Sequence, residues 1–415
     1  MRFINFQLIA YPELPEDFVQ THKSNWVTAD PKLFDPARVG LLYNNAVDLL
    51  VAAAESGYDA VGVNEHHNTG YAMTPSPNLL AAQLVRETSD VAVCVLGNTL
   101  VQYNPPVRVA EEFAMLDVMS GGRLIAGFPN GTPMDTAYSY GINPSELRDR
   151  YREANELITR AWAADEPFEF NGRFTQLRYA NPIPSPLQKP RPPIWIPGSG
   201  VVETWDFCCD NDYLYAYMSV SGYYKAQHIT EGYWDRVRAK GIEPNPFRGA
   251  FAVFLAAADS YAEAKEKYGP AAEYFFNRAF HVAPEFGNPP GIISEATLRK
   301  MFELSGVSDE ELWDFSAPGF DELVEKSFVI AGSYDSVGEQ LEALARRTNV
   351  GNLVTVTSYG NMPKDVADAH TREVGAKVLP QIRGLFEDEW EHRWWPEAAG
   401  LPAHVRNAQV KEAVR

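Results

Sequence analysis

The chain has 415 residues, of which 45% are hydrophobic and 22% charged, so it can bury a sizeable core. Its 36 Lys and Arg residues against 55 Asp and Glu residues give a formal net charge of −19, which disfavours binding to nucleic acid and to anionic membranes. No long apolar run and no basic-then-apolar leader is present, so the sequence predicts a cytoplasmic protein. Three cysteines, two of them adjacent, fit neither a disulfide framework nor a zinc site.

Short runs rich in Val, Ile and Leu alternate with amphipathic segments along the chain. The predicted strands are Phe3–Ala10, Ala60–Asn64, Val91–Asn98, Leu124–Phe128, Ile194–Pro197, Tyr213–Tyr217, Ala250–Ala256 and Leu353–Thr357. The predicted helices are Ala37–Ser56, Asn78–Thr88, Val107–Met119, Pro144–Ala163, Glu203–Cys208, Tyr223–Lys240, Tyr261–Ala283 and Val366–Phe386. This alternation predicts an α/β fold, a parallel (β/α)8 TIM barrel with insertions after several strands.

Three segments depart from the alternation. Phe168–Tyr179 has an Asn-Gly pair between two aromatic runs, which predicts a hairpin. Residues 284–319 form a long insertion, either a lid-like cover over an active site or a surface excursion with no role. We expect a barrel domain over residues 1–387 and a C-terminal extension over residues 388–415, whose tryptophans pack on the barrel or on a second subunit.

The tetrapeptide Asn64-Glu65-His66-His67 is the strongest indication of function. It stands where an apolar strand meets a loop, and catalytic groups of parallel α/β proteins gather at the carboxyl ends of strands. Burying an imidazole without partners costs free energy, so two adjacent ones need a reason. Adjacent residues on a strand point to opposite faces, so Glu65, His66 and His67 would coordinate one metal ion poorly, and a metal hydrolase is a weak alternative.

A helix after Asn104 begins at Pro106 and ends at Ser120-Gly121-Gly122, because glycine readily adopts the left-handed conformation that stops a helix. Its charged residues could form one structural ion-pair cluster between this helix and the following strand. They are Arg108, Glu111, Glu112, Asp117 and Arg123.

Two loops at strand ends could approach an anion closely. Asn130-Gly131 follows the fourth strand, and small, donor-rich loops of this kind can approach a phosphate or a ring system. Gly198-Ser199-Gly200 stands between a strand and a helix, where backbone N–H groups and a hydroxyl make a phosphate cradle. The alternative is an ordinary strand-to-helix turn capped by Ser199. Together with the histidines, these loops suggest a phosphate-tailed cofactor.

These motifs, in this order, resemble the bacterial luciferase-like flavin-dependent monooxygenase family. The resemblance runs through Asn64–His67, Pro106–Glu112, Leu116–Leu124, Gly198–Gly200 and Ala331–Val337. It implies an FMN site at the barrel mouth, a separate reductase that delivers reduced FMN, and reaction with O2 through a flavin hydroperoxide. The oxygen would go to a small, hydrophobic organic substrate. A homodimer formed through helices early in the barrel is also implied.

The resemblance also implies roles for single residues. His66 and His67 would be catalytic, with His66 nearest the flavin and His67 orienting its neighbour. Asn98 would bind the polar edge of the flavin ring, and a non-proline cis peptide bond near Thr99-Leu100 would support it. The remaining cofactor-binding residues would be Thr99, Asn130, Gly131, Tyr151, Gly198, Ser199 and Gly200.

One departure from the family stands at Asn130, where many relatives have arginine. Losing a charge-assisted phosphate contact weakens binding by about 1.5–3 kcal/mol, which suits an enzyme that borrows reduced flavin transiently.

Two alternatives keep the fold. A deazaflavin could replace FMN and transfer hydride without oxygen, or the protein could bind flavin without catalysis. Aromatic residues near strand ends favour a substrate cavity over the second alternative; they are Tyr103, Tyr138, Tyr140 and Tyr217. If Phe128 also lines the mouth with Tyr138 and Tyr217, a hydrophobic substrate is favoured.

Overall fold

The computed structural model describes residues 1–218, 222–287, 289, 291–292 and 318–401. Most of the lid-like insertion predicted at 284–319 therefore lies outside the described residues, as do residues 402–415 of the predicted extension. Among the residues that are described, no helix is both long and apolar enough to cross a membrane.

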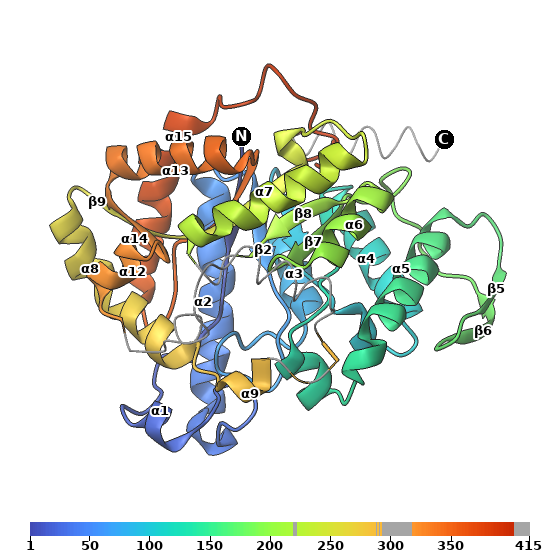
Figure 1. Cartoon of the computed structure of the whole chain (residues 1–415), viewed down its shortest axis with the longest axis horizontal. Helices are drawn as coiled ribbons and strands as arrows, with labels where there is room; N and C mark the ends of the chain where they lie inside the picture. Colours follow the sequence, from blue (N-terminus) through green and yellow to red (C-terminus); the bar gives the residue numbers. More distant parts are fainter. Residues whose placement is uncertain (219–221, 288, 290, 293–317, 402–415) are drawn as a thin grey trace.

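Eight parallel strands close into a barrel with helices between them (Figure 1). The strands are β1 (Arg2–Phe6), β2 (Ala60–Val63), β3 (Ala92–Val95), β4 (Leu124–Gly127), β7 (Ile194–Gly198), β8 (Leu214–Tyr217), β9 (Gly249–Ala258) and β11 (Asn352–Val356). Their order is β11-β1-β2-β3-β4-β7-β8-β9, and the pairing of β9 with β11 closes the ring. The predicted TIM barrel is confirmed.

Most of the longer helices follow the prediction with shifted ends, whereas the helix at Tyr334–Thr348 was not predicted. The longer ones are α2 (Pro36–Glu55), α3 (Pro77–Glu87), α4 (Val107–Ser120), α5 (Leu147–Ala163), α6 (Val202–Asn211), α7 (Tyr223–Ala239), α8 (Tyr261–Tyr274), α13 (Tyr334–Thr348) and α14 (Lys364–Glu373). Short helices are α1 (Phe18–Thr21), α9 (Pro284–Gly287), α12 (Phe320–Glu325) and α15 (Leu379–Ile382). The 3-10 turns are η1 (Pro31–Leu33), η2 (Leu100–Gln102), η4 (Pro144–Glu146) and η5 (Pro246–Arg248), and the π-helical segments are η3 (Met134–Ser139), η6 (Phe275–Ala279) and η7 (Val374–Val378).

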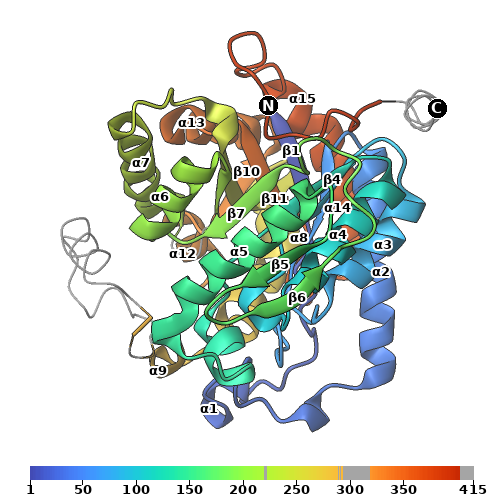
Figure 2. The same cartoon turned by 90° about the vertical axis from the view of Figure 1, so that its right-hand side faces the viewer.

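Local sequence explains several helix ends. Asp35 caps α2 by accepting a hydrogen bond from the amide of Ala37, and Pro36 occupies the first helical position. The predicted glycine stop of α4 is confirmed, because Gly121 has a φ of 69° in the left-handed region. The predicted Asn-Gly hairpin also forms, as β5 (Phe168–Asn171) and β6 (Gln176–Ala180), and it lies along the outer side of α5 (Figure 1 and Figure 2).

One strand was not predicted. β10 (Val329–Ser333) pairs with the second half of β9, whose ten residues are long enough to carry β8 and β10 in succession. Its last residues, Ala331–Ser333, belong to the Ala331–Val337 segment of the family resemblance, and it leads directly into α13, which Ser333 caps.

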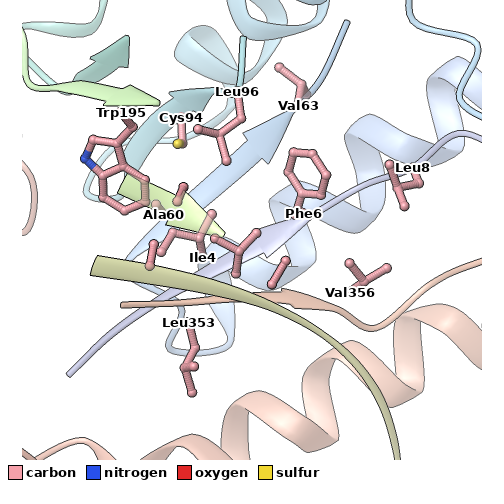
Figure 3. Packing of buried hydrophobic residues seen from close by; sticks show 14 of the residues in the cluster. Ile4, Phe6, Leu8, Ala60, Val63, Cys94, Leu96, Trp195, Leu353 and Val356 are labelled. Atoms are coloured by element: carbon pink, nitrogen blue, oxygen red, sulfur yellow. The ribbon is translucent and has the colours of Figure 1, made fainter. Parts of the chain in front are cut away.

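The core fills the barrel and the layer between strands and helices. Figure 3 shows Ile4, Phe6, Cys94 and Leu96 pointing toward one another, and all four are buried. At the opposite end from the loops that follow the strands, the segment after α15 packs against the strand starts. There Trp394 accepts a hydrogen bond from the indole N–H of Trp195 at its carbonyl, 2.9 Å away, so this part of the extension packs on the barrel.

The expected ion-pair cluster around α4 is wrong, because its members make separate hydrogen bonds. Arg108 pairs with Glu112 on the surface, whereas the Asp117 carboxylate accepts from Gln188. Arg123 instead lies buried and donates to carbonyls at the end of α3, including that of Thr88. The physical reason is that free carbonyls at a helix C-terminus attract a guanidinium as strongly as a distant carboxylate does.

Strands β3 and β4 approach each other too closely for a side chain at Gly127. An added Cβ there would lie 2.3 Å from the carbonyl oxygen of Val95 and 2.7 Å from Cα of Leu96. Because backbone atoms of a paired strand cannot move aside, we expect Gly127→Ala to lower the free energy of unfolding by about 1–3 kcal/mol. Gly40→Ala is the matched control, since its Cβ would meet nothing within 4 Å and alanine favours the helix. Urea denaturation measures both, and equal effects would contradict the close approach.

Candidate active site

The loops that follow β2, β3, β4 and β7 are joined by direct contacts. The backbone N–H of Thr99 donates to Oε2 of Glu65 at 2.6 Å, and this hydrogen bond joins the loop after β3 to the loop after β2. A Cβ at Gly131 would lie 2.5 Å from Cγ2 of Thr99, which brings in the β4 loop. Nδ2 of Asn130 donates to Oγ1 of Thr204 at 3.2 Å, which reaches the first turn of α6 after β7. The histidine pair and the glycine loop therefore belong to one continuous rim.

The two imidazoles have different surroundings. His67 uses both ring nitrogens: Nε2 lies 3.0 Å from Oε1 of Glu65, and Nδ1 lies 3.1 Å from the hydroxyl of Tyr140. His66 uses only Nδ1, which lies 2.8 Å from Oδ2 of Asp135. Its Nε2 has no hydrogen-bond partner among the described residues. His66 is therefore the imidazole available for chemistry, and His67 is held as part of the frame.

Glu65 anchors that frame as a buried acceptor. Besides Thr99 and His67, it accepts from the hydroxyl of Tyr103 at 2.9 Å. Burial and the neighbouring Glu65 carboxylate raise the pKa of the Tyr103 phenol far above its ordinary value, so Tyr103 keeps its proton and donates. Nδ2 of Asn98 in turn donates to the Tyr103 oxygen at 2.7 Å. This network fixes the ends of β2 and β3 against each other.

Asp135 holds both histidines. Its Oδ1 accepts from the backbone N–H of His67 at 2.8 Å, while Oδ2 takes His66 and the hydroxyl of Thr132. Burial opposes the charge, but attraction to the His66 imidazole and these hydrogen bonds outweigh it and hold the pKa of Asp135 below its usual range. An ionised Asp135 therefore fixes Nδ1 of His66 as the donor and leaves Nε2 facing outward.

The Asp135 carboxylate should make stability depend on pH. Because its pKa is depressed in the folded protein, its contribution is present above the unfolded pKa of about 3.9 and is lost as pH falls through the lower folded value. Asp135→Asn should thus cost about 1–3 kcal/mol at pH 7, since the amide nitrogen cannot accept a hydrogen bond and one of the three donors loses its partner, and the deficit should shrink below about pH 4. Urea denaturation of both proteins from pH 7 to pH 3 tests this. A deficit that stays constant would show that the charge is not involved.

The glycine loop and the start of α6 form the other end of the rim. Gly200 has a φ of 108°, and a Cβ there would lie 2.8 Å from Ile229 of α7. The N-cap of α6 is Val201, which makes no side-chain hydrogen bond, so Ser199 does not cap the helix and its hydroxyl is exposed. The alternative of a turn capped by Ser199 is therefore wrong, and the N-terminus of α6 has no side-chain cap.

A cation that the sequence did not reveal lies beside this helix end. Nη1 of Arg148, on α5, is 2.9 Å from Oε1 of Glu203 in the first turn of α6. The same guanidinium donates from Nη2 to the carbonyl of Ile292 at 3.4 Å. No fixed sequence spacing links Arg148 to the glycine loop, so only the fold brings them together.

Two features expected to support the flavin, the Tyr151 hydroxyl and a non-proline cis peptide bond, are both found in the structure. The hydroxyl of Tyr151 donates to the carbonyl of Phe128 at 2.6 Å, and the ring is buried against Phe207. The non-proline cis peptide bond lies at Leu96-Gly97, so its expected position near Thr99-Leu100 is wrong. Residue 97 has no room for a side chain, because a Cβ there would lie 2.3 Å from the Gly127 carbonyl oxygen.

The aromatic residues expected at the mouth are only partly there. Phe128 is fully buried between Phe113 and Trp162, in the layer between strands and helices, and Tyr217 packs on Phe251. Tyr138 is exposed and contacts Phe286 of α9. The substrate argument built on Phe128 and Tyr217 is therefore wrong, because both rings fill the core.

Open polar atoms at the rim fit a flavin ring. Oδ1 of Asn98 is buried and has no hydrogen-bond partner among the described residues, and the same holds for both amide atoms of Asn64. Native proteins seldom leave such groups unpaired, and a flavin has donors and acceptors along one edge. Asn64 was not singled out from the sequence, although its place before Glu65 was available as an indication.

Comparisons with known proteins agree with this geometry. A family model described as luciferase-like monooxygenase matches residues 18–350. The oxygenase component of the flavin-dependent trigonelline monooxygenase of Acinetobacter baylyi is 33% identical over 162 residues, 37% of this chain and 43% of that protein. The F420-dependent glucose-6-phosphate dehydrogenase of Microbacterium testaceum is 31% identical over 169 residues, 39% of this chain and 48% of that one. Each match spans less than half of the relative's length.

Two solved structures share the fold over most of the chain. Monooxygenase RslO1 from Streptomyces bottropensis has a TM-score of 0.69 at 20% identity, covering 92% of this chain and 99% of that one. The oxygenating constituent of 3,6-diketocamphane monooxygenase from Pseudomonas putida, a type II Baeyer–Villiger enzyme solved with FMN, has a TM-score of 0.66 at 20% identity, covering 82% and 93%.

Proposed function

Because this chain belongs to the luciferase-like monooxygenase family, we propose that it is the oxygenase of a two-component system. It would take reduced FMN from a separate flavin reductase and use O2 to oxygenate a small organic substrate. Reduced FMN, when bound, supplies the electrons for activating O2. The observation that carries the proposal is His66, whose Nδ1 is held by Asp135 and whose Nε2 is open.

Different residues of the chain would transfer the proton, bind the flavin ring and hold the phosphate. His66 would give or take a proton at Nε2, and Asp135 would keep the ring in the tautomer that allows it. Asn98 and Asn64 would bind the polar edge of the ring system. Gly131, Asn130, Ser199 and the amides at the start of α6 would hold the phosphate, with Arg148 close by. Tyr151 would support this end by fixing the β4 carbonyl at Phe128.

The proposal is tested by supplying reduced FMN enzymatically and following oxygen. Uptake of O2 coupled to a product that carries oxygen from labelled dioxygen, detected by mass spectrometry over a panel of lipophilic compounds, supports a monooxygenase. The alternative is a deazaflavin-dependent oxidoreductase, which the F420-dependent relative favours. Cofactor oxidation by a substrate without oxygen uptake, seen only with reduced F420, would establish that alternative and overturn ours.

The phosphate end gives a further expected result. Restoring the arginine by Asn130→Arg should tighten FMN binding about tenfold or more, because one charge-assisted hydrogen bond contributes about 1.5–3 kcal/mol. Quenching of FMN fluorescence measures the dissociation constant. Asn171→Arg, on the exposed hairpin, adds the same charge elsewhere and serves as the control. Equal tightening in both variants would mean that net charge, and not a local contact, is responsible.

We also propose a homodimer formed through helices early in the barrel. A groove of about 900 Å³ lies on the outside between α2, α3 and α14, where Val47, Asp48 and Arg86 contribute to its lining. It lies apart from the histidines.

A further inference from the structure

Three aromatic rings from separate loops cover one side of His66, and we call them the aromatic wall. They are Trp26, Tyr71 and Phe280, from the loops after β1 and β2 and the turn after η6. The centroid of Trp26 lies 5.5 Å from that of His66 at 80°, and Tyr71 lies 5.3 Å from it at 66°. Phe280 lies 5.9 Å from Trp26 and 5.2 Å from Tyr71. Both rings nearest His66 meet it edge to face, so they pack against one side of the imidazole.

Polar atoms beside this wall lack partners. Trp26 and Thr74 are each only 2% exposed. Nε1 of Trp26 and Oγ1 of Thr74 nevertheless have no hydrogen-bond partner among the described residues. Thr74 lies in the loop after β2, which also carries Tyr71. Its carbonyl accepts a hydrogen bond from the backbone N–H of His66, which brings it next to the wall. An unpaired buried indole N–H is costly and can be satisfied only by an acceptor.

The charge of the site is compatible with a neutral ring. The ionised carboxylate next to the wall, Asp135, is already paired with His66, with the backbone of His67 and with Thr132. The unpaired groups beside the wall, the indole N–H of Trp26 and the hydroxyl of Thr74, are uncharged. The surroundings of His66 thus combine flat aromatic surface with a few neutral polar groups, which is the usual lining of a pocket for a small ring compound.

We propose that the molecule oxidised at His66 is a planar aromatic or heteroaromatic compound that carries a hydrogen-bond acceptor. Its ring would lie against the aromatic wall, and its acceptor would receive the N–H of Trp26. This proposal rests on the proposed function in taking His66 as the residue next to the reacting atom. It goes further in naming the class of substrate.

Binding of three matched probes to the FMN-saturated protein tests the proposal without turnover. Benzamide has the ring and the acceptor, cyclohexanecarboxamide has only the acceptor, and ethylbenzene has only the ring. Ligand-detected NMR titrations give the dissociation constants. We expect benzamide to bind at least about threefold more tightly than cyclohexanecarboxamide, because aromatic contacts exceed the contribution of buried area alone. Equal binding of these two probes would overturn the proposal.

Substitutions of Trp26 test whether the probes bind at the aromatic wall. Trp26→Phe keeps a ring and removes the donor, so it should weaken benzamide about three- to tenfold and leave ethylbenzene unchanged. Trp26→Leu should weaken both aromatic probes. Tyr179→Leu removes an 80% exposed ring on the β5–β6 hairpin and should change neither. Unchanged benzamide binding in Trp26→Phe, or displacement of FMN by benzamide, would overturn the assignment. The comparison of probes in the unmodified protein stands even if a variant fails to fold.

The outcome is separable from that of the proposed function. Selective probe binding without oxygen uptake would contradict the monooxygenase and keep the aromatic site. Oxygenation of saturated compounds, with no preference for aromatic ones, would do the reverse.

Discussion

His66→Ala should lower the rate of product formation about a hundredfold or more while FMN binding changes little, because general acid–base help from a histidine contributes about 10²–10⁴ in rate. The structure gives the reason for singling out this imidazole. Within the described part of the chain, Nε2 of His66 has no hydrogen-bond partner, whereas both ring nitrogens of His67 are occupied, by Glu65 and Tyr140. Single-turnover oxidation with reduced FMN and an accepted substrate measures the rate, and fluorescence titration measures the binding of FMN.

The controls separate chemistry from structure. His228→Ala removes an exposed imidazole on α7 and should leave the rate unchanged. His66→Gln retains a side-chain N–H for Asp135, so it should keep the fold but not the rate. Unchanged product formation in both His66 variants would remove this residue from the mechanism.

Much of the barrel follows from local pattern. The eight predicted strands form because each is a short apolar run bounded by polar turns, and Asp35 and Gly121 end helices through backbone geometry alone. β10 was missed because its pairing depends on the length of β9, which belongs to a distant part of the chain. Local pattern also joined α8 and η6 into one helix, since a π-helical segment changes hydrogen bonding without changing the composition.

The site was predictable only where neighbours in sequence are neighbours in space. Alternation along a strand predicted that His66 and His67 point apart, but β2 ends at Val63 and both histidines lie in the loop after it. Their ring nitrogens have different partners there, Asp135 for His66 and Glu65 with Tyr140 for His67. Asp135 lies 69 residues from its hydrogen-bond partner His66, and no spacing rule connects a turn of η3 to the end of β2. Arg148 and Trp26 were missed for the same reason. Such residues become visible only when the loops after different strands are assembled.

Arg123→Met should be the most destabilising substitution in the α3–α4 region, lowering the free energy of unfolding by about 3–5 kcal/mol. The Arg123 guanidinium is buried and donates to four backbone carbonyls and to the hydroxyl of Thr88. The carbonyls are those of Val85, Thr88, Val91 and Ser120. Methionine fills much of the volume but cannot donate. The substitution therefore leaves buried acceptors at the end of α3 without hydrogen bonds, which is costlier than losing a surface pair.

Arg108→Met is the matched control, because Arg108 lies in the same stretch of sequence and has the same side chain. Its guanidinium is exposed and pairs only along the surface of α4 with Glu112, so its removal should barely change the urea midpoint. The two substitutions change net charge equally, so a difference between them measures burial and hydrogen bonding and not overall electrostatics. Similar midpoints in 150 mM salt would mean that water replaces the guanidinium at the end of α3, and that the barrel does not depend on this contact between α3 and β4.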